Sequence, residues 1–134
     1  MRRTIVAIIA GLAGWAVIVM VIDWGLRLGI PGYRLAEHTL VFTLQMKIAR
    51  LTMAAVTSVA TGVLVRVIAP GSRLAPWIVG LVVLGLFVPA HVELWHRFPI
   101  WYHLSFLVPL VPLVALGAWL ASRAPAQLPV SSSS

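Results

Sequence analysis

Four long apolar runs constrain this chain more than any other feature of its sequence. Among its 134 residues, apolar runs occupy positions 4–24, 49–68, 77–95 and 101–120. An α-helix needs about 20 apolar residues to cross the hydrocarbon core of a bilayer. A helix also satisfies its backbone hydrogen bonds internally, as lipid requires. The sequence therefore predicts an all-α integral membrane protein, folded as a four-helix transmembrane bundle with short connections.

The composition supports one membrane domain rather than a soluble protein. Hydrophobic residues make up 61% of the chain and charged residues 10%, whereas soluble domains carry charge on about a quarter of their residues. We assign residues 1–123 to a single transmembrane domain. Residues 124–134, with two prolines and four terminal serines, are expected to form a disordered polar tail.

The second run is longer than a bilayer requires. Residues 35–69 read as one helix that ends at Pro70-Gly71, so we expect this helix to extend beyond the membrane on the outer side, where residues 35–48 show an amphipathic pattern. Indole side chains prefer the headgroup level. The predicted interfacial anchors are Trp24, Trp77, Trp95, Trp101 and Trp119.

The basic residues indicate orientation rather than a nucleic-acid partner. They occur singly or in pairs at the ends of apolar runs, and five fall on each side of the predicted membrane. Arg2 and Arg3 directly precede the first helix, which usually dominates topology, so both termini are expected in the cytoplasm. Nine arginines against one lysine hint at a GC-rich genome, and we expect a protein of the bacterial inner membrane.

Small residues at four-residue spacing offer surfaces for close helix packing, which carries much of helix association in lipid. They occur in the first and second runs: Ala7 with Gly11, Ala10 with Gly14, and Ala54, Ser58 and Gly62. We expect packing within the chain, with contact between copies of the chain as the alternative. The expected partners are membrane lipid and either another protein or a second copy.

The three acids and all four histidines fall on one predicted membrane face, where they are candidates for function. Histidine and glutamate ligands with no sulfur suit zinc, copper or iron, and two facing histidines suit a b-type haem. The candidate metal or haem set is His91, Glu93, His96, His103 and His38. The alternative is that these side chains reach water from the helix ends. Glu93 and Arg97 are spaced to form an ion pair along a helix.

No catalytic constellation or phosphate-binding loop is present. We therefore favour a small inner-membrane protein without catalytic activity that acts by assembly, as an accessory subunit or a homo-oligomer. The first alternative is a membrane protein that binds metal or haem through the histidine and glutamate cluster. The second is a small four-helix transporter, which the lack of an acid in the middle of a span disfavours.

Overall fold

The computed structural model describes residues 1–124. These residues form five α-helices: α1 (Arg2–Gly29), α2 (Tyr33–Thr39), α3 (Leu44–Ile68), α4 (Ala75–Glu93) and α5 (Ile100–Arg123). All but α2 are long and apolar enough to cross a membrane. The prediction of an all-helical, four-span membrane bundle is confirmed, and the protein is a multi-pass membrane protein. The tail expected at residues 124–134 lies outside the described residues, apart from Ala124.

The expected continuous helix over residues 35–69 is wrong, because the chain breaks between α2 and α3. Leu40 adopts a left-handed conformation with φ 56°, which an α-helix cannot continue through. Thr43 then caps α3, since its side chain accepts a hydrogen bond of 3.3 Å from the backbone N–H of Met46. Such caps start helices. Of the segment expected to extend the second span, residues 35–39 thus belong to a separate short helix, whereas residues 44–48 are the start of α3.

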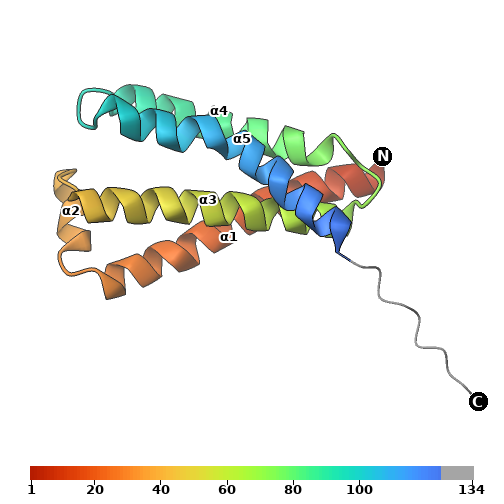
Figure 1. The fold of residues 1–134 in the computed structure, drawn as a ribbon, viewed down its shortest axis with the longest axis horizontal. Helices are drawn as coiled ribbons and strands as arrows, with labels where there is room; N and C mark the ends of the chain where they lie inside the picture. The colour runs from red at the N-terminus through yellow and green to blue at the C-terminus, as the bar shows by residue number, and fades with distance from the viewer. Residues whose placement is uncertain (125–134) are drawn as a thin grey trace, which may run out of the picture.

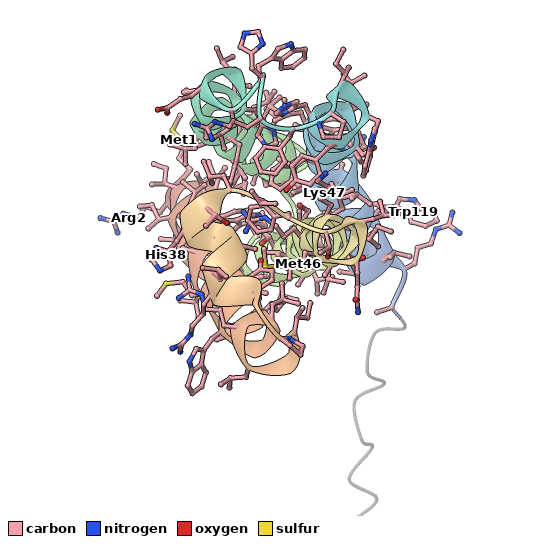
Figure 2. All side chains as sticks on the ribbon, turned by 90° about the vertical axis from the view of Figure 1, so that its left-hand side faces the viewer. Met1, Arg2, His38, Met46, Lys47 and Trp119 are labelled. Carbon is pink, nitrogen blue, oxygen red and sulfur yellow. The ribbon has the colours of Figure 1, made fainter. Side chains whose placement is uncertain are left out.

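The long helices cross closely at one end of the bundle, whereas at the other end α1, α3 and the α4–α5 pair spread apart (Figure 1). α3 lies centrally, with its largest contacts to α5 and α1, while α4 packs on α5 and α1. α1 and α3 diverge toward the end where α2 connects them, and Figure 2 views the bundle from that side. We call this the α2 end and the opposite one the N-terminal end.

Close packing depends on glycines in α3 and α5. A methyl group added at Gly62 would collide with the backbone of Val114 and Ala118, and one added at Gly117 would collide with the backbone of Val59. The backbones of α3 and α5 therefore meet in the half of the bundle near the N-terminal end. The first turns of α3 and α5, at the α2 end, lack that contact.

Other small residues of α1 and α3 lie close to neighbouring helices or are buried. Gly11 faces Val65 and Val79, and Gly14 faces Leu64. Ala7 and Ala54 are buried and Ala10 is half-buried. The hydroxyl of Ser58 donates a 2.7 Å hydrogen bond to the carbonyl of Ala54. All five tryptophans expected as interfacial anchors are exposed.

Candidate functional site

A chain of polar contacts joins the helices at the α2 end. Arg27 in α1 pairs with Asp23 one turn earlier, at 2.9 Å, and with Glu37 of α2, also at 2.9 Å. The second pair ties α2 to α1 across the connecting turn. Both carboxylates thus already have a cationic partner.

Arg50 is held differently, by phenols rather than carboxylates. Its guanidinium donates to the hydroxyl of Tyr33 at 3.1 Å and to that of Tyr102 at 3.3 Å. It also lies over the ring of Phe42, with 5.0 Å between the guanidinium carbon and the ring centroid. Within residues 1–124, no carboxylate lies within ion-pair distance of it. Arg50 is therefore a half-buried positive charge with no carboxylate in direct contact, while Asp23 and Glu37 share the single guanidinium of Arg27.

Tyr33 links the two parts of this network. Its ring is fully buried at the start of α2, and its hydroxyl donates to a carboxylate oxygen of Asp23 at 3.5 Å while accepting from Arg50. Burial raises the pKa of Tyr33 above its ordinary value of 10.0, and the charge of Arg50 opposes that rise. Tyr33 is consequently a neutral phenol at physiological pH.

A pair of buried histidines lies beside Arg50. The Nδ1 atoms of His91 in α4 and His103 in α5 are 2.7 Å apart, so one ring donates and the other accepts. Trp95 stacks on His103 with 4.8 Å between ring centroids. The Nε2 atom of His103 is buried with no hydrogen-bond partner among the described residues.

Two cavities of about 260 Å³ each occupy the space where the helices spread apart. Arg50 and Glu37 line both of them, as do the rings of Phe87 and Phe106. The first cavity continues to the histidine pair and Tyr102, and the second to α1. The arrangement offers hydrogen-bond donors, the positive charge of Arg50 and the carboxylate of Glu37 inside a wall of aromatic and aliphatic side chains.

The structure brings together only two members of the predicted metal or haem set, His91 and His103. His38, Glu93 and His96 are exposed, and Figure 2 shows His38 at the edge of the molecule, pointing away from it. Among the described residues, no three histidine or acidic side chains lie close enough to hold one metal ion.

To hold a haem iron, each of two histidines would have to direct a ring nitrogen at the metal. The Nδ1 atoms of the histidine pair instead bond to each other.

The ion pair expected between Glu93 and Arg97 is not formed in the described part of the chain. The reason is that α4 ends at Glu93, which places Arg97 beyond the helix.

No separate role for Arg50, Tyr33 or Tyr102 was predicted from the sequence. The available signal was an arginine between Ala49 and Leu51, inside an otherwise apolar stretch. Such a residue usually faces the interior of a bundle. The phenols could not be assigned to it, because they lie 17 and 52 positions away along the chain.

Comparisons of the chain with known protein families, with curated proteins and with solved structures find no match.

Proposed function

We propose that this protein binds an anionic amphiphile of the membrane, with the negatively charged head at Arg50 and the apolar tail in the bilayer. The observation that carries the proposal is the guanidinium of Arg50, which lines both cavities at the α2 end and contacts only neutral polar groups among the described residues. A carboxylate or phosphate there would form charge-assisted, bidentate hydrogen bonds.

The two nearby carboxylates, those of Asp23 and Glu37, do not pair with Arg50. Glu37 lines the same cavities, but it is engaged by Arg27 at 2.9 Å. Asp23 is engaged by the same arginine. Neither acid forms an ion pair with Arg50, so an external anion can bind its guanidinium without breaking an ion pair.

The size and walls of the cavities support an amphiphile. Each holds about 260 Å³, slightly less than the roughly 300 Å³ at which sites for whole small molecules begin. This space suits a head group rather than a complete lipid. The second cavity reaches Met20 of α1, which is 68% exposed, so a tail can leave the bundle through that side.

Localisation and assembly complete the proposal. We place the protein in the bacterial inner membrane with both termini in the cytoplasm, on the arginine pair that precedes the first span. The cavities would then open in the outer half of the bilayer. The accessory or homo-oligomeric role expected from the sequence stays a prediction. Glycines among the small residues that motivated it contact other helices of the same chain.

The test is quenching of tryptophan fluorescence by a fatty acid carrying bromine on its chain, with the protein in nanodiscs. Trp15 lines the second cavity, so a bound brominated chain would quench it. We expect saturable quenching that Arg50→Gln weakens about tenfold, since a hydrogen bond to a charged group contributes about 1.5–3 kcal/mol. The methyl ester of the same acid, which lacks the negative charge, is the control ligand.

Two further variants keep this result interpretable. Arg34→Gln removes an exposed arginine of α2 with the same change in charge, and it should bind like the wild type. Arg50→Lys retains the positive charge and should fall between the wild type and Arg50→Gln, because lysine lacks the bidentate geometry. Equal quenching by acid and ester, or equal binding by Arg50→Gln and Arg34→Gln, would refute the proposal.

A further inference from the structure

The N-terminal end of the bundle carries positive charge with no acid to balance it. The three acidic residues of the chain, Asp23, Glu37 and Glu93, all belong to the α2 end. The N-terminal end holds five arginines: Arg2, Arg3, Arg66, Arg73 and Arg123. Within residues 1–124, every ion pair belongs to Arg27 at the α2 end. The arginines of the N-terminal end are therefore available to an external anion.

Two cavities at this end share one of these arginines, Arg73, in their lining. A cavity of about 380 Å³ lies between the end of α3, the start of α4 and the end of α5, and it is lined by Arg66 and Arg73. A neighbouring cavity of about 480 Å³ is lined by Arg73 again and by Arg3 of α1. Arg73 thus stands between two concave sites, each with a second guanidinium.

Aromatic residues flank the first of these cavities. Trp77 of α4 and Trp119 of α5 both line it, with exposed fractions of 49% and 48%. Half-exposed indoles at helix ends are typical of the level at which lipid head groups meet acyl chains. Arg123 lies over the ring of Trp119, at 4.2 Å from its centroid. The cavity therefore lies at the depth of a lipid head group.

We propose that this cavity binds the phosphate of an anionic phospholipid, through Arg66 and Arg73, with the acyl chains alongside Trp77 and Trp119. Guanidinium groups match phosphate geometry with paired hydrogen bonds. Basic pockets between membrane helices are suited to phospholipid head groups. The lipid, rather than soluble phosphate, is the occupant we infer, because the tryptophans supply surface for acyl chains. This site is at the other end of the molecule from Arg50 and does not depend on the function proposed there.

Native mass spectrometry measures the binding directly. The full chain in detergent is incubated with equal amounts of phosphatidylglycerol and phosphatidylcholine, and the retained lipid is identified. We expect the wild type to retain phosphatidylglycerol preferentially. The double variant Arg66→Gln with Arg73→Gln should lose this preference by roughly fivefold for each arginine.

The matched control is Arg34→Gln with Arg97→Gln, which changes the net charge equally at exposed positions of the α2 end. It should retain phosphatidylglycerol like the wild type, and circular dichroism would verify that both double variants are folded. Equal loss in the control would show attraction by net charge alone and would overturn the site. Displacement of the lipid by inorganic phosphate at a similar concentration would overturn the lipid assignment, as would retention without preference.

Discussion

At the scale of single residues, the contacts of Tyr33 hold α2 against the bundle. Its buried ring packs against Phe42, with 6.1 Å between ring centroids. Its hydroxyl connects Asp23 to Arg50. A phenol suits this position because it accepts from a guanidinium and donates to a carboxylate at the same time. Phenolate formation would end the donation and place a second negative charge beside Asp23.

The raised pKa of Tyr33 predicts an alkaline loss of stability. An unfolded chain loses the Tyr33 proton near pH 10, whereas the folded protein keeps it to a higher pH. Above pH 10 the folded state therefore binds more protons than the unfolded state, and stability falls as pH rises.

Phenolate absorbance measures this titration. Because the chain has two tyrosines, single variants can separate their contributions. The difference between wild type and Tyr33→Phe isolates Tyr33, and Tyr102→Phe, in which Tyr33 is the remaining tyrosine, checks it. We expect a midpoint above 10.0 in the folded protein and near 10 after denaturation. A folded midpoint at or below 10 would contradict the burial of the phenol.

At the scale of elements, the contact of α3 with α5 determines where the bundle is closed and where it is hollow. Gly62 and Gly117 bring the two backbones together in one half. In the other half, larger side chains such as Phe106 and Arg50 stand between the helices and line the cavities. The same two helices thus supply both the tight contact and the walls of the candidate site.

Replacing either glycine should destabilise the bundle. Gly62→Ala and Gly117→Ala each insert a methyl group against backbone atoms, which cannot move aside as a flexible side chain would. Overpacking of this kind costs about 1–3 kcal/mol, and thermal unfolding followed by circular dichroism in detergent would report it.

Gly25→Ala in α1 and Gly85→Ala in α4 are matched controls, since a methyl group at either position meets no atom within 4 Å. They should leave the unfolding temperature unchanged or raise it slightly, because alanine favours a helix over glycine by about 1 kcal/mol. If all four variants unfolded at the same temperature, the backbone contact between α3 and α5 would be disproved.

At the scale of the whole molecule, the chain is electrically asymmetric along the bundle. The N-terminal end is purely cationic, while the α2 end combines the three acids with the remaining basic residues. The ligands that we propose differ accordingly: the phosphate of an anionic phospholipid at the N-terminal end, and an anionic head group beside Arg50 at the α2 end.

This architecture predicts that the two loops label from opposite sides of the membrane. Because the chain contains no cysteine, Ser72→Cys in the connection between α3 and α4 and Arg97→Cys between α4 and α5 each introduce a single reactive thiol. With an impermeant maleimide on intact cells, only Arg97→Cys should react if the termini are cytoplasmic. Both should react after permeabilisation, and labelling of both from the same side would refute the four-span arrangement.

Sequence alone determined the number and approximate positions of the membrane helices, since the length and hydrophobicity of a span are properties of one continuous segment. It also placed the three acids and the four histidines at one end, which follows from alternation of direction across four spans. The sequence misjudged the junction of α2 and α3, where the left-handed Leu40 and the capping Thr43 outweigh an uninterrupted apolar pattern.

Only the tertiary structure decided which of those residues meet. Arg50 reaches Tyr102 of another helix, and His91 bonds to His103 rather than to the exposed His96 five positions along. Such pairings depend on how each helix is rotated and where it crosses its neighbours. These quantities are determined by side-chain packing across the whole bundle, as at Gly62 and Gly117, and no single segment encodes them.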